Sequence, residues 1–376
     1  MSIWHVITGE YPPQPGGVSD YTRLVCDGLA SAHNTVHVWA PADGLRSSID
    51  GSIKVHRLPG RFGTRALRML ADAIHATPGC SILVQYVPHA YGFRAMNVQF
   101  CLWLRAIRRS GLKVMFHEVA FPVSATQSCR QNALGAVTSI MARLVCRSAS
   151  LIMVASERWA GMLRDYGAIA PILWLPVPSN IPVVIDAAAR EQWRHKYAVS
   201  NHVLIGHFAN YSDYSLTRLA QLLSALFQEQ TGLSFLLLGA KSIELRQRLL
   251  SWNPHFANRL HASGAVAATD ISAGLAACDL MVQPYPDGVS TRRSSMSALL
   301  AHGRAIVTTA GIGTEQLWRD SGAVVAVPVD APDRLRAELS RMIVSDEIRS
   351  RQGRAAKALY EDRFALRHTI AALTST

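Results

Sequence analysis

The chain has 376 residues, of which 49% are hydrophobic and 17% are charged, a balance that excludes an intrinsically disordered protein. Its length exceeds that of a usual single domain, so we expect two domains, each with a core of its own. Lysine and arginine number 38 against 26 acidic residues, a formal net charge of +12, which favours anionic partners without choosing among nucleotide sugars, membrane headgroups and nucleic acids.

The first half of the chain alternates between two kinds of pattern. Short β-branched and aliphatic runs predict strands at 3–8, 36–40, 81–86, 113–118, 151–155 and 171–176. Apolar residues at three- and four-residue steps predict helices at 21–32, 62–75, 96–110 and 133–148. Strands that alternate with helices predict a parallel sheet with helices on both of its faces.

A proline-rich segment, 175–182, interrupts this alternation. Proline lacks a backbone donor and holds the preceding residue extended, so we place the interdomain linker there. The predicted domains are an N-terminal one at 1–178 and a C-terminal one at 183–356. A charged, helical closing segment is expected to cross back, so that a helix at 357–376 completes the first domain.

The second half repeats the alternation. Its predicted strands are 202–209, 234–238, 259–263, 280–284, 305–309 and 323–327. Its predicted helices are 215–229, 243–252, 269–277, 294–302 and 314–320. We therefore expect a second doubly wound parallel sheet.

Solubility and compartment follow from the cysteines and the apolar runs. The six cysteines stand singly in apolar stretches, which predicts reduced core thiols and a cytoplasmic protein. No signal-peptide pattern opens the chain and no apolar run reaches the roughly 18 residues that span a bilayer, so any membrane contact would be peripheral, at the inner face. Scattered basic residues and the lack of a recognition module argue against nucleic-acid binding.

Two loops could carry chemistry. Gly16 and Gly17 precede the first helix, where free N–H groups and the helix dipole favour an anion. The alternative is a tight turn with Ser19 or Asp20 as the helix N-cap.

The second loop follows the strand at 280–284 and carries Ser290, Thr291, Arg292 and Arg293 at a helix start. Hydroxyls, backbone donors and guanidinium groups could converge there on a diphosphate. Because cations at a helix N-terminus oppose the macrodipole, an anion should compensate them. The alternative is a solvated arginine pair with a serine cap.

Four segments in order, 9–22, 116–118, 264–288 and 299–315, make the chain resemble the family-four-type retaining glycosyltransferases (glycosyl transferases group 1). The resemblance implies an α/β fold of the GT-B type, with two Rossmann-like doubly wound parallel-sheet domains facing across a cleft, the N-terminal one on the acceptor side and the C-terminal one on the donor side. It implies transfer of a sugar from a nucleotide-diphosphate sugar to a glycan, lipid-linked or small-molecule acceptor. It also implies retention of configuration, without a metal or other cofactor.

The resemblance assigns roles in the first half by position. It implies that Gly16 and Gly17 lie under the donor phosphates and that His117 reaches the transferred sugar near its reacting centre, although a lone histidine at a strand end is usually structural. Glu118 could orient a ligand or cap its loop. Tyr21 is expected to contact the acceptor or the sugar.

In the second half, Asn210 is a further expected acceptor or sugar contact, and Glu315 resembles a loop glutamate near the donor. The alternative for Glu315 is to cap the helix that follows.

The chain departs from the family pattern at one point. The family commonly carries two glutamates separated by seven residues. Asp287 could stand for the first as a catalytic residue, but Ser295 lies eight positions on, and counting back from Gly303 places Ser290 and Ala298 there instead.

The cations that the family places after the first strand of its second domain are also missing here, apart from His207. We therefore expect Arg292 and Arg293 to supply this charge, so that an S-x-R-R element replaces the paired glutamates in a divergent branch. Loss of the glutamates leaves a second hypothesis, a catalytically silent relative that binds a nucleotide sugar or a partner enzyme. The basic, apolar stretches 61–70 and 103–113 could lie on an anionic membrane or be ordinary amphipathic helices.

Overall fold

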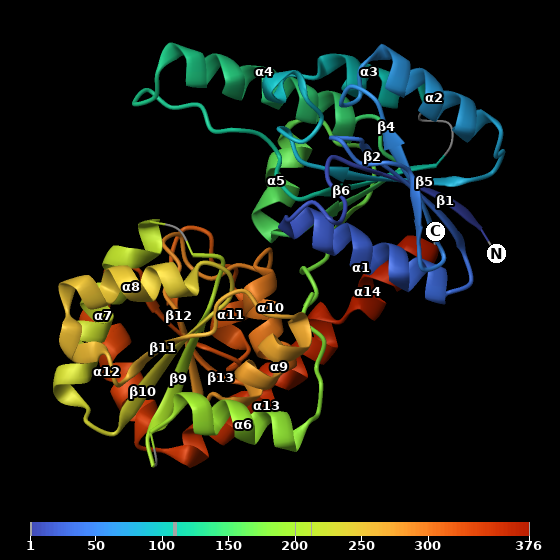
Figure 1. Cartoon of the computed structure of the whole chain (residues 1–376). Coiled ribbons are helices and arrows are strands. Elements are labelled where there is room, and N and C mark those ends of the chain that lie inside the picture. Colours follow the sequence, from blue (N-terminus) through green and yellow to red (C-terminus); the bar gives the residue numbers. More distant parts are fainter. Residues whose placement is uncertain (1, 108–110, 200, 212, 376) are drawn as a thin grey trace. The chain divides into compact units, whose positions relative to one another are not determined.

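The computed structural model describes residues 2–107, 111–199, 201–211 and 213–375. The chain forms two compact units, of which the first comprises Met1–Val177 and Leu366–Thr376 and the second comprises Pro178–Ala365 (Figure 1). The chain therefore leaves the first unit once, within the predicted proline-rich linker, and returns to it near the C-terminus.

The first unit is built on a sheet of eight strands in the order β3-β4-β2-β1-β5-β6-β7-β8. The strands are β1 (Ile3–Thr8), β2 (Thr35–Pro41), β3 (Ser48–Asp50), β4 (Ile53–Leu58), β5 (Ser81–Tyr86), β6 (Leu112–Phe116), β7 (Leu151–Val154) and β8 (Ile172–Trp174). Neighbouring strands run parallel except β3 and β4. The strand order reverses direction between β1 and β5.

Helices cover both faces of this sheet (Figure 1). One face packs against α2 (Thr64–His75), α3 (Val98–Ile107), α4 (Cys129–Cys146) and α5 (Glu157–Asp165). The other face packs against α1 (Gly17–Ser31) and α14 (Leu366–Thr374). A Cβ atom on Gly28 of α1 would lie 2.7 Å from the Ile370 side chain of α14, so the glycine permits this close packing.

The second unit has six parallel strands in the order β11-β10-β9-β12-β13-β14. The strands are β9 (Val203–Phe208), β10 (Leu233–Leu238), β11 (Leu260–Ala262), β12 (Leu280–Gln283), β13 (Ala305–Ala310) and β14 (Val325–Pro328). This is the strand order of a Rossmann fold, whose direction reverses between its first and fourth strands, here β9 and β12.

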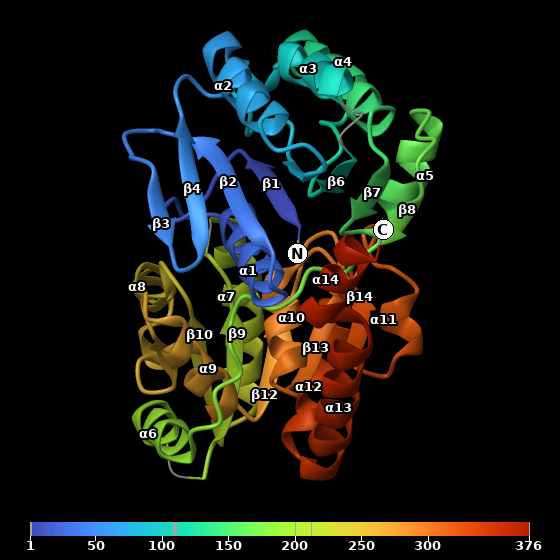
Figure 2. The same cartoon turned by 90° about the vertical axis from the view of Figure 1, so that its right-hand side faces the viewer.

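Two layers of helices enclose the second sheet. One face packs against α7 (Asp213–Glu229), α8 (Ser242–Trp252) and α12 (Pro332–Ile343). The other packs against α6 (Ala187–Tyr197), α9 (Ala268–Ala277), α10 (Ser294–Ala301) and α13 (Asp346–Leu359), with the short α11 (Leu317–Asp320) beside them. Figure 2 shows α12 and α13 side by side.

The predicted α/β fold with two parallel sheets is confirmed. The strand predicted at 113–118 ends at Phe116, and the single helix predicted at 357–376 is instead the end of α13, a π-helical turn at Tyr360–Phe364 and α14. Ala365 separates the last two with φ −59° and ψ 139°, an extended conformation that ends a helix. Residues 108–110, within the predicted helix 96–110 and the basic stretch 103–113, lie outside the described residues.

Two further findings bear on the sequence predictions. Five of the six free cysteines are buried as expected, but Cys129 is exposed at the first residue of α4, because that end of the helix projects into solvent. In the described part of the chain, no helix is long and apolar enough to cross a membrane.

Candidate functional site

In open parallel sheets, ligands bind beyond the carboxyl ends of the strands, where the strand order reverses. In the first unit this edge lies between β1, which leads into Glu10, and β5, which leads into His89. The next strand, β6, leads into His117 and Glu118. Two of the predicted residues therefore lie at this edge. Glu10 and His89, which were not predicted, also lie there. Each comes just after one of the two strands that flank the reversal, and this position in the sequence could have identified them.

The start of α1 is occupied by a carboxylate from the chain itself. Oε1 of Glu10 accepts a hydrogen bond from the Ser19 backbone N–H at 2.9 Å. Gly16 is the N-cap of the helix, and a Cβ atom on it would lie 2.2 Å from this oxygen. A Cβ atom on Gly17 would meet nothing within 4 Å. The glycine at 16 thus makes room for Glu10.

This arrangement changes what the glycine loop can do. A carboxylate at a helix N-terminus already compensates the dipole and one free N–H group. A phosphate at Gly16 and Gly17 would have to displace Glu10 or lie beside its negative charge. The alternative cap is wrong, since the N-cap residue is Gly16 and neither Ser19 nor Asp20 takes that position.

His117 is held as a neutral imidazole. Its Nε2 lies 2.8 Å from Oε1 of the buried Gln85, and its backbone N–H donates to the Tyr86 carbonyl at 3.0 Å. Because the glutamine oxygen only accepts, Nε2 carries the proton and Nδ1 keeps a free lone pair. Burial lowers the pKa of His117 to about 4. At neutral pH this side chain can accept a hydrogen bond at Nδ1 and carries no charge.

Tyr21 and Glu118 differ in what they leave accessible. Tyr21 is buried, its ring packs edge-on against His117 with centroids 4.8 Å apart, and its hydroxyl bonds the Thr369 side chain of α14. Its place is therefore in the core beneath His117. Glu118 is half-exposed, with a carboxylate oxygen 3.6 Å from Nδ1 of His89, and its hydrogen bond raises the pKa of that histidine.

In the second unit the predicted residues gather around α10. Arg292 Nη2 lies 2.7 Å from one carboxylate oxygen of Asp287, and Arg293 bonds the other. The Arg293 guanidinium also lies over the Tyr285 ring, 4.6 Å from its centroid. Arg293 is the N-cap residue of α10, with no side-chain capping bond. The arginines are thus a paired group held by one carboxylate, and the serine cap considered as the alternative is absent.

Glu315 holds the loop from beneath. It is buried, and its carboxylate accepts bonds from the Thr291 N–H at 3.2 Å, the Thr291 hydroxyl at 2.9 Å and the Trp318 indole N–H at 2.9 Å. Charged buried groups are stable when hydrogen-bonded in this way. Glu315 therefore fixes the backbone of Thr291. The neighbouring Ser290 hydroxyl is buried and, in the part of the chain that the structure describes, has no hydrogen-bond partner.

Glycines bring the loop after β12 into close contact with the loop after β13. Gly288 has φ +86°, and a Cβ atom on it would lie 2.2 Å from the Gly311 nitrogen. The Gly313 N–H donates to the Asp287 carbonyl at 2.9 Å. Asp287 is thereby fixed at its backbone as well as by its two arginines.

The end of β9 carries less charge than the sequence allowed. Burial lowers the pKa of His207 to about 3, so it does not supply the cation considered for this segment. Asn210 is exposed in the loop after β9, and Ser212 lies outside the described residues. The Gln283 side chain donates to the Phe208 carbonyl at 2.8 Å, which joins the ends of β12 and β9 at the strand-order reversal.

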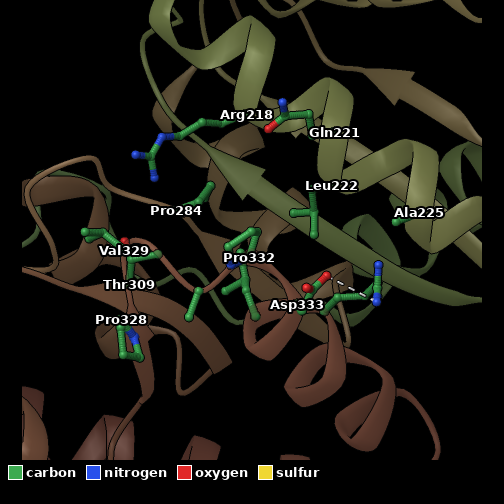
Figure 3. A pocket seen from close by; sticks show the side chains of 13 residues that line it. Arg218, Gln221, Leu222, Ala225, Pro284, Thr309, Pro328, Val329, Pro332 and Asp333 are labelled. Atoms are coloured by element: carbon green, nitrogen blue, oxygen red, sulfur yellow. Dashed lines mark ion pairs between the residues drawn. The ribbon is translucent and has the colours of Figure 1, made fainter.

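A cavity of about 450 Å³ lies on the other face of this edge, between α7 and α12 (Figure 3). Arg218 and Gln221 of α7 stand above it, and Asp333, paired with Arg336 at 3.3 Å, stands below. Pro284, just before the arginine loop, forms part of its wall. None of the residues predicted for the site lines this cavity.

The residues that could ligate a metal are dispersed. Within the described ranges, no group of three or more histidine, cysteine, aspartate or glutamate side chains is arranged to hold a metal ion.

Comparisons with known proteins address the fold. No family model matches the sequence, and no curated protein matches it. A glycosyltransferase from Rickettsia africae is 13% identical, with a TM-score of 0.76 over 100% of this chain and 98% of that one. A sucrose-phosphate synthase from Thermosynechococcus elongatus is 15% identical, with a TM-score of 0.73 over 100% and 98%.

HepE from Anabaena, solved in complex with UDP, is 16% identical, with a TM-score of 0.71 over 100% of this chain and 99% of that one. These similarities span both units and show that the chain has the GT-B fold.

Proposed function

We propose that the chain is a glycosyltransferase that transfers a sugar from a nucleotide-diphosphate sugar to a glycan, lipid-linked or small-molecule acceptor, with retention and without a metal. The observation that carries the proposal is the pair Arg292 and Arg293, held by Asp287 at the carboxyl edge of a Rossmann-like sheet. Full-length similarity to glycosyltransferases supports it. We place the chain in a divergent branch of the family-four type, in which the S-x-R-R element replaces the paired glutamates.

The arginines are suited to a leaving diphosphate. Two guanidinium groups against one carboxylate leave a net positive charge at the start of α10, where backbone N–H groups add to it. Asp287 is a positioning residue in this proposal, because it fixes both guanidinium groups before the donor arrives. As the glycosidic bond breaks, negative charge grows on the diphosphate, and donors already in place stabilise it without reorganising.

Ser290, Thr291 and Glu315 complete the proposed donor site. The buried hydroxyl of Ser290 has no hydrogen-bond partner among the described residues, and a phosphate oxygen would satisfy it. Glu315 acts indirectly in this proposal, by holding Thr291 in place. A carboxylate that already accepts these bonds has no role as a direct phosphate ligand, since it would repel the anion.

In the first unit, we assign His117 to a sugar contact through its unprotonated Nδ1. A neutral imidazole accepts a hydrogen bond from a hydroxyl group and offers no charge to a phosphate. The same proposal leaves Glu118 to orient a hydroxyl of the acceptor, since it is half-exposed. Tyr21 supports His117 from the core and does not contact a ligand directly.

The second candidate is a catalytically silent relative that binds a nucleotide sugar. In one alignment of the family's paired glutamates, Asp287 takes the first place and Ser295 the second; in the other, Ser290 and Ala298 take them. Asp287 is itself engaged by two arginines. This candidate predicts nucleotide binding without donor turnover for any acceptor. Measuring hydrolysis and transfer of the bound sugar separates it from the first.

Thermal unfolding with UDP, GDP, ADP, TDP and CMP tests the proposal. HepE was solved with UDP, so UDP and its sugars come first. Binding at about 100 times Kd stabilises a protein by about 2.7 kcal/mol, which a melting curve resolves. We expect one nucleotide to stabilise the wild type, and a variant with Arg292→Gln, Arg293→Gln and Asp287→Asn, which leaves no carboxylate unpaired, to lose this shift.

Arg68→Gln provides the control, because Arg68 is an exposed residue of α2 in the other unit. It should keep the full nucleotide shift. The absence of a shift with every nucleotide would end both the transferase and the silent-binder proposals.

A further inference from the structure

The opposite edge of the second sheet contains a polar cavity of about 320 Å³, where β12 and β13 begin. Four arginines and two aspartates contribute its charges: Arg190, Arg194, Arg304, Arg349, Asp279 and Asp346. They come from α6, α13 and the segments that follow α9 and α10. None of them belongs to the proposed donor site, which lies at the carboxyl ends of the strands.

Two of the arginines are compensated within the cavity. Arg194 bonds Asp279 with Nη1 and Oδ2 2.6 Å apart. Arg349 bonds Asp346 at 3.2 Å and also donates to two carbonyls at the end of α12. These two pairs account for both aspartates, so the charge of the other two arginines is not balanced by acids of the cavity.

Arg304 is largely buried by its surroundings and bonds only carbonyl oxygens. It donates to the carbonyls of His302 at 3.0 Å, Ala276 at 3.2 Å and Cys278 at 3.0 Å. Among the described residues, no carboxylate forms an ion pair with it. Burial lowers its pKa and the positive charge of Arg190 acts in the same direction, whereas Cys278 and Asp279 act to raise it. In the described part of the structure, the only acid that acts on Arg304 is Asp279, which forms its ion pair with Arg194 instead. A largely buried cation with so weak a counter-charge is costly, and an anion in the cavity would lower that cost.

A purely structural role explains only part of the cluster. Arg304 and Arg194 satisfy carbonyls at the end of α9, which is a usual role for arginine near a helix C-terminus. Arg190 makes no such bond. Its ion pair is with the adjacent Glu191 at 3.1 Å, and both side chains are more than half exposed. With four arginines against two aspartates, the lining carries a net charge of +2.

We propose that this cavity is a binding site for a phosphate group, a dianion that would match the excess of arginines over aspartates in its lining. Guanidinium groups bind phosphate oxygens through paired hydrogen bonds. The cavity is large enough for a phosphate with a small organic group attached. The phosphate can belong to a small metabolite or to a lipid headgroup, and the chemistry of recognition is the same.

This site goes beyond the proposed function and does not rest on it. Between the two ends of the second sheet, β12 runs for four residues and β13 for six. At roughly 3.3 Å per residue, the cavity and the donor edge therefore lie about 13–20 Å apart along these strands. A phosphate ligand here would therefore leave the donor edge open. Its occupation would connect α6, α13 and the start of β13, and so stabilise the second unit.

The test is thermal unfolding of the full chain with inorganic phosphate, compared with sodium chloride at equal ionic strength to separate binding from screening. We expect a saturable rise in melting temperature with phosphate alone. Arg190→Glu should weaken the apparent affinity at least tenfold. Because Arg190 is exposed and its one ion pair among the described residues is with Glu191, this change should leave the fold intact, which the melting temperature without phosphate checks.

Two variants and one further probe complete the design. Arg68→Glu makes the same charge change on an exposed residue of α2 and should keep the phosphate response. The variant with Arg292→Gln, Arg293→Gln and Asp287→Asn should also keep it, which excludes the donor edge as its origin. If the wild type sediments with phosphatidic acid vesicles and Arg190→Glu does not, the phosphate that the site binds belongs to a lipid headgroup. An equal response of wild type and Arg190→Glu to both probes would overturn the proposal.

Discussion

The contact between Gly16 and Glu10 can be tested with a matched pair of substitutions. In Gly16→Ala, the new methyl group would lie 2.2 Å from the Glu10 carboxylate oxygen, whereas in Gly17→Ala it would meet nothing within 4 Å. The Glu10 side chain is flexible and can swing away, so the cost is the interaction that it loses. That interaction is a charged hydrogen bond to the Ser19 N–H at 2.9 Å, at the positive end of α1.

The magnitude follows from these parts. A hydrogen bond to a charged group contributes about 1.5–3 kcal/mol, and a carboxylate near a helix N-terminus about 0.3–1 kcal/mol. Glu10 is partly exposed, so water recovers some of the bond, and we expect Gly16→Ala to destabilise the start of α1 by about 2 kcal/mol. Gly17→Ala should be neutral or slightly stabilising, because alanine favours a helix by up to about 1 kcal/mol over glycine.

Hydrogen–deuterium exchange of the α1 peptide measures this locally, without interference from the second unit. A loss of about 2 kcal/mol corresponds to roughly 30-fold faster exchange. Glu10→Ala should accelerate exchange by a similar factor, and adding Gly16→Ala to it should have little further effect, since the two changes remove one interaction. Equal exchange in Gly16→Ala and Gly17→Ala would refute the reasoning.

Two further predictions concern the second unit. Gly288→Ala combines φ +86° with a Cβ atom 2.2 Å from the Gly311 nitrogen, and should lower the free energy of unfolding by at least about 2 kcal/mol. Gly322→Ala, at φ +63° with open space around it, should lower it by about 1 kcal/mol. Urea unfolding that finds the two variants equally stable would contradict this. His207 stays neutral in the fold because burial lowers its pKa to about 3, while the unfolded chain takes up a proton below about 6.5. Stability should therefore fall as pH drops from about 6.5 towards 3, by up to about 1.4 kcal/mol per pH unit from this group, and His207→Phe should flatten the slope of unfolding free energy against pH; an unchanged slope would show that another group carries it.

Much of the fold was open to prediction because the central strands are continuous apolar runs. Strands such as β5 and β10 are buried on both faces and so stand out in the sequence. The strand β4, which lies between β3 and β2, was missed because Lys54 and His56 interrupt its apolar residues, which is typical of a strand with one exposed face.

The candidate site was predictable only as a set of loops. The pattern identified Arg292 and Arg293, but their shared contact with Asp287 depends on the path of the loop, which no periodicity encodes. The same holds for Glu10, whose carboxylate returns to α1 across the proline-rich turn. The binding of a phosphate at this helix start stays a prediction, and nothing in the sequence said that a carboxylate of the chain itself would lie there.

The order in which the chain is synthesised gives the two-unit arrangement a further consequence. α14 belongs to the first unit but follows the whole of Pro178–Ala365 along the chain. During translation, the surface of α1 around Gly28, which packs closely against Ile370 and Leu366, must wait uncovered until the second unit has left the ribosome. Domains commonly fold one after another from the N-terminus. Here the first unit is synthesised first but is completed only when α14 emerges. A nascent chain stalled before residue 366 would therefore present the apolar face of α1 to chaperones.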